Sequence, residues 1–194
     1  PGIILAVPSN GADAARMLRE CVRLAREEQR VVVFLEPIAL YPMRDLHADK
    51  DGGWMTRYPD PSEVIGLGEV GVHGTGKDLA IVTFGNGTYL SRQAEKRLAG
   101  QGVKARVIDT RWLSPLPVEG LLQAVQGAKR ILIVDETRHS GGVAEGLMAL
   151  FAENCDVPLA RLTAEDSFIA TGPAYAATMP SADSIFEAAM AMMG

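Results

Sequence analysis

The feature that most constrains this chain is an alternation of short apolar runs with longer amphipathic segments. Near the start, residues 3–7 are apolar, a segment with apolar residues three and four apart extends to about Gln29, and residues 31–35 form a continuous, largely β-branched run. This order predicts strand, helix and strand, and such a unit implies a parallel pair of strands. The continuous run at 31–35 further indicates a strand covered on both faces.

The first helix should bury one face. Pro8 ends the preceding strand, and Ser9 or Asn10 can cap the helix. The residues predicted to form the buried face are Ala14, Met17, Leu18, Cys21, Val22 and Ala25.

From residue 78 onward the alternation is regular, which predicts a doubly wound, mostly parallel α/β domain. Strands are expected at 79–84, 105–108, 131–134 and 159–162, and helices at 89–99, 118–125, 143–153 and 180–193. In the last helix Met192 falls off the apolar stripe, which suggests a contact surface that would let the chain associate.

The stretch between the two alternating regions is rich in proline and glycine, so we expect an extended connection there. We therefore divide the chain into a strand–helix–strand remnant of one domain at 1–55, a linker at 56–77 and a second domain at 78–194. The chain enters its first strand directly after Pro1-Gly2 with no initiator Met, which suggests a cut inside a domain.

The composition indicates a soluble globular protein, with 47% hydrophobic and 22% charged residues. A net charge of -5 and the lack of any Lys/Arg run argue against a nucleic-acid partner. No apolar run reaches the roughly 18 residues that a membrane span needs, and no secretory signal is visible, so a cytoplasmic protein is expected. Cys21 and Cys155 lie far apart in apolar surroundings and predict buried thiols, not a disulfide.

Two glycine motifs match nucleotide-binding patterns, but their context rejects both. Residues 66–71 fit the dinucleotide fingerprint, yet no helix can follow them and only two apolar residues precede them. Residues 71–77 fit the start of a phosphate-binding loop, but Asp78 replaces the metal-binding hydroxyl and a strand follows. Both stretches are predicted to be loops.

The most informative polar cluster is the turn at 135–142, where a predicted strand ends and a helix begins. Open α/β sheets place ligands at this edge. Glu136, Arg138, His139 and Ser140 are therefore the candidate residues for an interface or anion-binding turn, with Ser140 as the expected helix cap. Asp135 and Glu136 should point in opposite directions, so they form no acid–base pair. His47 and His73 are expected to be solvated.

The order of several segments resembles the beta subunits of thiamine-diphosphate-dependent 2-oxo acid dehydrogenases. No single segment decides the resemblance, but their order and spacing match over nearly the whole chain. The matching segments are 1–9, 33–37 with Leu40-Tyr41, 78–85, 107–116, Glu136 with Gly141-Gly142, Asp166, Tyr175 and 180–185.

The resemblance implies that the chain is the C-terminal part of the beta half of the decarboxylating component. The glutamate that activates the coenzyme, the histidine near the substrate and the metal motif belong upstream of Pro1, so no catalytic or coenzyme-binding residue is assigned here. The parent enzyme would use thiamine diphosphate and Mg²⁺, and none is expected on this fragment. Relatives often hold a potassium ion in the loop around Cys21 and Val22, but here residues 24–30 are longer and more charged.

The parent would decarboxylate a 2-oxo acid and acylate a lipoyl group, with Glu36-Pro37 and Leu40-Tyr41 favouring the branched-chain type. The implied partners are an alpha half or subunit, a second beta copy and the lipoyl acyltransferase core. The fragment alone would serve subunit assembly and docking. Transketolase and deoxyxylulose-phosphate synthase share the fold, and a non-catalytic assembly module or a stand-alone nucleotide-binding domain are alternatives of other classes.

Overall fold

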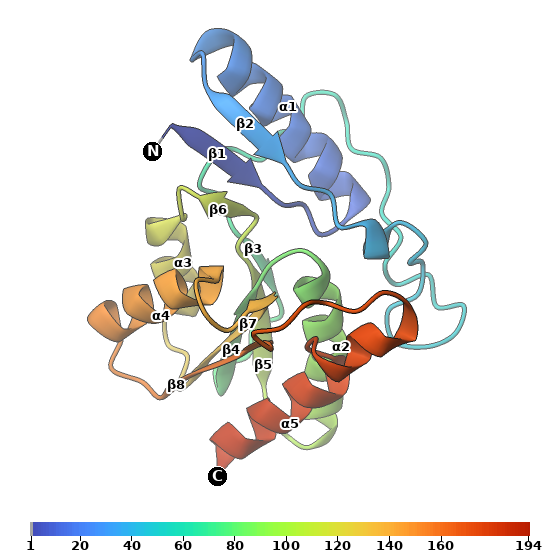
Figure 1. The fold of residues 1–194 in the computed structure, drawn as a ribbon, viewed down its shortest axis with the longest axis vertical. Helices are drawn as coiled ribbons and strands as arrows, with labels where there is room; N and C mark the ends of the chain where they lie inside the picture. Colours follow the sequence, from blue (N-terminus) through green and yellow to red (C-terminus); the bar gives the residue numbers. More distant parts are fainter. Residues whose placement is uncertain (1) are drawn as a thin grey trace.

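Two β-sheets organise the chain in the computed structural model, which describes residues 2–194 (Figure 1). The strands are β1 Ile3–Ala6, β2 Val31–Phe34, β3 Gly71–His73, β4 Leu79–Thr83, β5 Ala105–Asp109, β6 Trp112–Ser114, β7 Ile131–Arg138 and β8 Leu159–Ala164. The helices are α1 Gly11–Glu27, α2 Asn86–Gly100, α3 Val118–Val125, α4 Val143–Asn154 and α5 Ala182–Met193, with short 3-10 turns at Ile38–Leu40 and Gly172–Ala177.

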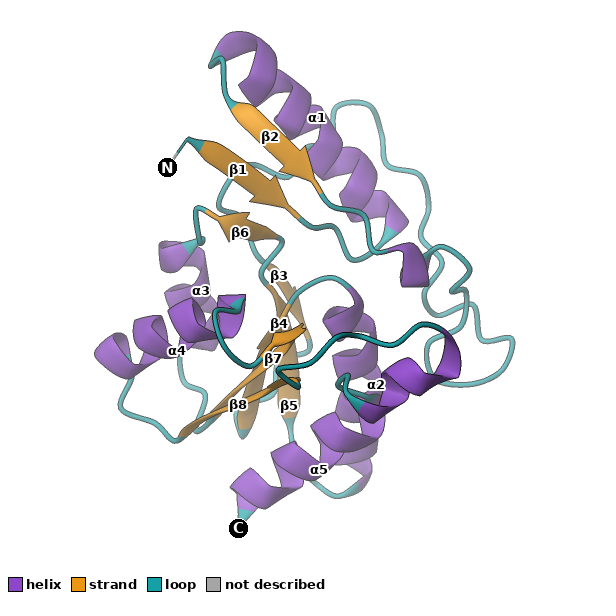
Figure 2. Ribbon diagram, viewed as in Figure 1, coloured by secondary structure: helices purple, strands orange, loops and turns teal. Residues whose placement is uncertain are grey.

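The larger sheet has the strand order β3-β5-β4-β7-β8, and all its pairs are parallel except the antiparallel edge strand β3. Figure 2 shows α2 and α5 on one side of this sheet and α3 and α4 on the other. Each side buries its own apolar cluster, with β4 contributing Leu79 and Ile81 to one and Ala80 and Val82 to the other. The predicted doubly wound, mostly parallel fold is therefore confirmed.

The smaller sheet has the order β2-β1-β6, in which β1 and β2 are parallel and β6 is antiparallel to β1. Only one face is covered, by α1. On the other face Val31 is 61% exposed and Val33 44% exposed. The expectation that this strand is covered on both faces is wrong within this chain, because nothing among residues 2–194 packs on its second face.

Helix α1 begins at an Asn10 cap, whose side chain accepts a hydrogen bond from the Asp13 amide (3.0 Å). Its buried stripe includes Met17 and Cys21 as predicted. Leu18 and Val22 were also expected to be buried, but each is 48% exposed. The apolar residues of α1 cover a wider arc than one face of a three-stranded sheet can bury, so Leu18, Val22 and Ala25, the last also predicted to be buried, remain at the surface.

Strand β6 was not predicted, and it is what joins the two sheets. It follows β5 of the larger sheet after only two residues, yet it pairs with β1 of the smaller sheet. Trp112 of β6 is fully buried in the cluster beneath α1. A three-residue strand has no periodicity of its own, so only the tertiary pairing defines it. None of the helices within residues 2–194 combines the length and the apolar character needed to cross a membrane.

Candidate functional sites at the carboxyl ends of the strands

Asp135 lies in the second half of β7, and its side chain caps the helix that follows. Its buried carboxylate accepts hydrogen bonds from the amides of Thr137 (2.7 Å) and Ala144 (2.7 Å). The prediction that Ser140 caps α4 is therefore wrong: the N-cap position is Gly142, which has no side chain to do so. The cap comes from a carboxylate on the strand, which reaches the helix because both ends meet at the same edge of the sheet.

Ser140 instead binds the segment that follows β8. Its amide and hydroxyl both donate to the Asp166 carboxylate, at 2.8 and 2.6 Å. These two bonds hold the pKa of Asp166 below its ordinary value. Arg138 donates from Nε to the Ser140 carbonyl (3.0 Å) and so closes the turn on itself. Residues 138–140 of the candidate site therefore form an exposed loop that is fixed by hydrogen bonds.

His139 lies in the same loop and is held by two residues of β8. Its Nδ1 is 3.2 Å from the Thr163 hydroxyl, and Nη2 of Arg161 is 2.8 Å from its Nε2. Arg161 also donates to the His139 carbonyl (3.2 Å). Arg138, His139 and Ser140 are thus brought together, but all three make bonds that fix the turn.

Glu136 turns away from these three residues toward the N-terminus of α2. The Asn86 side chain donates to its carboxylate at 3.3 Å. Burial raises the pKa of Glu136, while Asn86 and the Gly87 amide pull it back. Asp135 and Glu136 therefore serve two different helices, as their positions on a strand predicted.

The crevice between β4 and β7, where a doubly wound sheet binds ligands, is closed by the N-terminal part of the chain. Gly85 at the start of α2 has φ 56°, and a Cβ there would lie 3.3 Å from side-chain atoms of both Val7 and Pro37. Ser9 donates to the Thr88 hydroxyl (3.1 Å) across the same boundary. The switch point of the larger sheet is used for packing against the smaller one.

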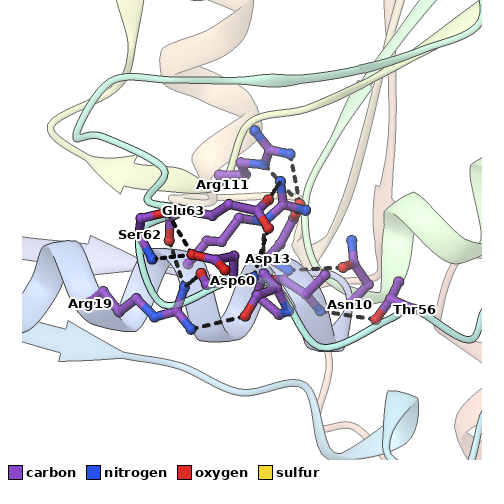
Figure 3. A network of polar contacts seen from close by, with 11 residues as sticks. Asn10, Asp13, Arg19, Thr56, Asp60, Ser62, Glu63 and Arg111 are labelled. Atoms are coloured by element: carbon purple, nitrogen blue, oxygen red, sulfur yellow. Dashed lines mark hydrogen bonds and ion pairs between the residues drawn. The ribbon is translucent and has the colours of Figure 1, made fainter.

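A buried ion pair crosses the same boundary and was not predicted. Nε and Nη2 of Arg111 both donate to one carboxylate oxygen of Asp13, at 3.0 and 2.7 Å (Figure 3). The side chain of Asp13 is 3% exposed and that of Arg111 is 13% exposed. The two residues are 98 positions apart, so no local spacing could have revealed the pair.

Two further titratable groups lie around this pair. Burial raises the pKa of Asp109 to about 6, although Ser9 and the Arg111 amide favour its anion. Burial lowers the pKa of His73 to about 4, helped by Arg92 and Arg111. His73 was expected to be solvated and is instead half-buried, with its Nε2 fully enclosed. His47 is exposed, as predicted.

The residues proposed for a potassium loop lie inside a helix. Cys21 is buried in the cluster beneath α1, and Val22 points to solvent on the same helix, which continues to Glu27. Burial raises the pKa of the Cys21 thiol to about 11, and Glu20 adds to this effect. The ion site itself stays a prediction. No three His, Cys, Asp or Glu side chains within residues 2–194 are grouped to hold a metal.

Residues 66–70 and 74–77 of the two rejected glycine motifs are loops as predicted, but residues 71–73 form strand β3, so the prediction of a loop is wrong there. No helix follows residues 66–71: strand β3 begins at Gly71, and β4 follows the second motif. A glycine is required at position 71 for packing, because a Cβ there would lie 2.9 Å from Nη2 of Arg111. That position keeps the space for the guanidinium group that pairs with Asp13.

With the two-sheet arrangement described, comparison with known proteins decides the family. The family model named "Transketolase, C-terminal domain" matches residues 68–185, which is more than half of the chain. The chain belongs to this family. Curated relatives extend the likeness to the N-terminal sheet as well.

Two of the similar curated proteins come from Bacillus subtilis (strain 168) and are named for different 2-oxo acids. The pyruvate dehydrogenase E1 component subunit beta is 28% identical over 97% of this chain and 55% of its own length. The 2-oxoisovalerate dehydrogenase subunit beta is 28% identical over 86% of this chain and 48% of its own. The chain thus spans about half the length of the curated relatives it matches.

Solved structures support the fold. A structure titled "Split gene transketolase, inactive beta4 tetramer" superimposes with a TM-score of 0.75, at 21% identity, over 100% of this chain and 58% of its own. A 2-oxoglutarate:ferredoxin oxidoreductase from Magnetococcus marinus gives a TM-score of 0.62 at 14% identity, over 99% of this chain and 42% of its own. At these identities the likeness concerns the fold alone.

Proposed function

We propose that this chain is the C-terminal part of the beta half of a thiamine-diphosphate-dependent 2-oxo acid dehydrogenase. The observation that carries the proposal is the match to E1 beta subunits across 97% of the chain, which includes both sheets. The parent would decarboxylate a 2-oxo acid and pass the acyl unit to a lipoyl group. The pyruvate and branched-chain relatives match at the same identity, so the proposed substrate class is 2-oxo acids in general.

The residues of this chain do not fit the coenzyme on their own. The first turn of α1 is already capped by Asn10 and by Thr56, whose hydroxyl accepts from the Ala12 amide (3.0 Å). The first turn of α4 is capped by the carboxylate of Asp135, which would repel a diphosphate. We therefore assign no step of the reaction to residues of this chain, and Mg²⁺ and coenzyme would be held by the rest of the parent.

The role proposed for this chain is subunit assembly. Its N-terminal sheet presents an apolar face that includes Val31 and Val33, and α1 adds Leu18 and Val22 on another side. Surfaces of this kind mark contacts with other chains. Met192, suggested by its sequence position as a contact, packs partly against the core cluster under α5, so the N-terminal surfaces support the role better. An alpha half, a second beta copy and a lipoyl acyltransferase core are the proposed partners.

The remaining alternatives differ in their chemistry. A transketolase or deoxyxylulose-phosphate synthase would act on sugar phosphates with the same fold. A purely structural module would have no coenzyme-dependent parent. We also keep as part of the proposal the division at residues 55 and 77 into a domain remnant, a linker and a second domain.

The test uses the parent protein and this chain side by side. We expect CO₂ release from carboxyl-labelled pyruvate or 2-oxoisovalerate by the parent, dependent on thiamine diphosphate, and no activity with xylulose 5-phosphate. The isolated chain should release no CO₂ and should bind thiamine diphosphate with Mg²⁺ more weakly than micromolar in calorimetry. Activity on sugar phosphates alone, or tight coenzyme binding by the isolated chain, would contradict the proposal.

A further inference from the structure

A cavity of about 560 Å³ lies at the carboxyl ends of β1 and β2, beside the first turn of α1. This volume is in the range of small-molecule sites. Most of its wall is apolar and comes from three stretches of chain. The apolar lining consists of Pro8, Pro37, Leu40, Met43, Trp54 and Met55.

The walls of the cavity are fixed by bonds that lie outside it. The Trp54 ring packs edge-on against Tyr89, with centroids 5.1 Å apart, and the Trp54 amide donates to the Arg44 carbonyl (2.9 Å). Thr56 is tied to α1 through the Ala12 amide (3.0 Å). The segment 54–56 is therefore held over the strand ends without any ligand.

The polar groups of the lining are almost all engaged already. Ser9 donates to Thr88, and the side-chain oxygens of Asn10 and Thr56 accept from amides of the first turn of α1. The Tyr41 hydroxyl donates to Oε2 of Glu36 (2.7 Å). The second carboxylate oxygen, Oε1 of Glu36, accepts no hydrogen bond from residues 2–194 and remains available to a ligand.

The charge of the cavity selects between ligand classes. Glu36 is its charged residue, and no lysine or arginine lines it among the described residues. The N–H groups of the first turn of α1 are occupied by caps, so they offer little to an anion. A carboxylate or phosphate would meet an uncompensated negative charge here, whereas a cation would find a partner.

We propose that this cavity binds an aliphatic ammonium ion, with the carbon chain among the apolar side chains and the ammonium group at Glu36. The flexible side chains of Met43 and Met55 can adapt to chains of different length. The Tyr41 ring next to Glu36 adds a face that attracts cations. No residue of the turn at 135–142 lines this cavity, and ammonium binding here is independent of the proposed parent activity.

The test measures binding of three probes with the same chain length to this protein: hexylammonium, 1-hexanol and hexanoate. Trp54 and Trp112 are the two tryptophans, and Trp112 is fully buried, so intrinsic fluorescence should report the cavity. We expect the affinity to fall in the order hexylammonium, hexanol, hexanoate. The Trp54→Phe variant should lose the signal, and NMR shifts confined to the lining residues should replace it.

The Glu36→Gln substitution measures how much the carboxylate charge of Glu36 contributes to ammonium binding. Because Glu36 is exposed, its removal should weaken hexylammonium binding by about threefold to fivefold and leave hexanol within twofold. Glu119→Gln, an exposed carboxylate at the start of α3, should leave all three affinities unchanged. Hexanoate binding as tightly as hexylammonium, no binding of any probe, or an unchanged affinity in Glu36→Gln would overturn the proposal.

A fourth probe separates the two sources of such a cation. A capped Gly-Lys-Gly peptide presents the same ammonium group on a lysine side chain. Tighter binding of the peptide than of hexylammonium would support a lysine of a partner protein as the ligand, and the reverse would support a free amine.

Discussion

Asp13→Asn should be among the most destabilising single polar substitutions in this protein. The change leaves the Arg111 guanidinium, 13% exposed, without its carboxylate partner. Removing one member of a buried pair costs about 3–5 kcal/mol because the other charge stays desolvated. The residual exposure of Arg111 lets water reach part of the group, so we expect a loss near the lower end, about 3 kcal/mol in the free energy of unfolding.

Urea unfolding followed by circular dichroism measures this loss, and two further variants make it specific. Lys129→Met breaks a surface pair with Asp78 (2.8 Å), in which Lys129 is 66% exposed, and should cost less than about 1 kcal/mol. Arg111→Met combined with Asp13→Asn should cost clearly less than the sum of the two single changes. A loss for Asp13→Asn no larger than that for Lys129→Met, or two single losses that simply add, would contradict a desolvated and coupled ion pair.

Asp109 holds its proton more tightly in the folded protein (pKa about 6) than at its ordinary 3.8, so stability should fall by about 2 kcal/mol as the pH rises from 4 to 7. Asp109→Asn should remove most of this slope in urea titrations at several pH values. Cys21, with a pKa near 11, should resist Ellman's reagent at pH 8 in the folded protein while the half-buried Cys155 reacts; equal labelling rates would contradict this. Gly71→Ala places a Cβ 2.9 Å from Nη2 of Arg111 and should cost about 1–3 kcal/mol, whereas Gly100→Ala, with open space around it, should be nearly neutral in the same assay.

Long periodic segments of the sequence predicted their elements closely. The apolar spacing at 118–125 gives the bounds of α3, and the runs at 79–84 and 131–134 give the cores of β4 and β7. The predictions that no helix follows residues 66–71 and that a strand follows residue 78 are also confirmed. In these cases the apolar periodicity within the segment is sufficient to predict a helix or a strand, because the segment is long enough to show it.

The prediction of burial was weaker because burial depends on what packs nearby. Val31 and Val33 look like an interior strand but lie on an uncovered face, and Leu18 and Val22 look like core but face solvent. The apolar character of a segment predicts that its surface packs against a partner. It does not indicate whether that partner belongs to the same chain.

The candidate turn shows the same limit for polar residues. Its position at a strand end was predictable, but Ser140 contacts Asp166 and His139 contacts Arg161, and both partners come from the next strand and the loop after it. The pair of Asp13 and Arg111 escaped prediction for the same reason. Such contacts depend on tertiary structure, and the sequence of either residue's neighbourhood does not encode them.

The short strand β6 also sets an order of events in biosynthesis. Strand β6 can join the smaller sheet only after residues 112–114 leave the ribosome, and Trp112 then fills the core beneath α1. Because β6 follows β4 and β5 in the chain, the core beneath α1 closes only after these two strands of the larger sheet have been made. The apolar cluster beneath α1 is thus completed only after more than half of residues 2–194 has been made, and its surface stays accessible to chaperones during that interval.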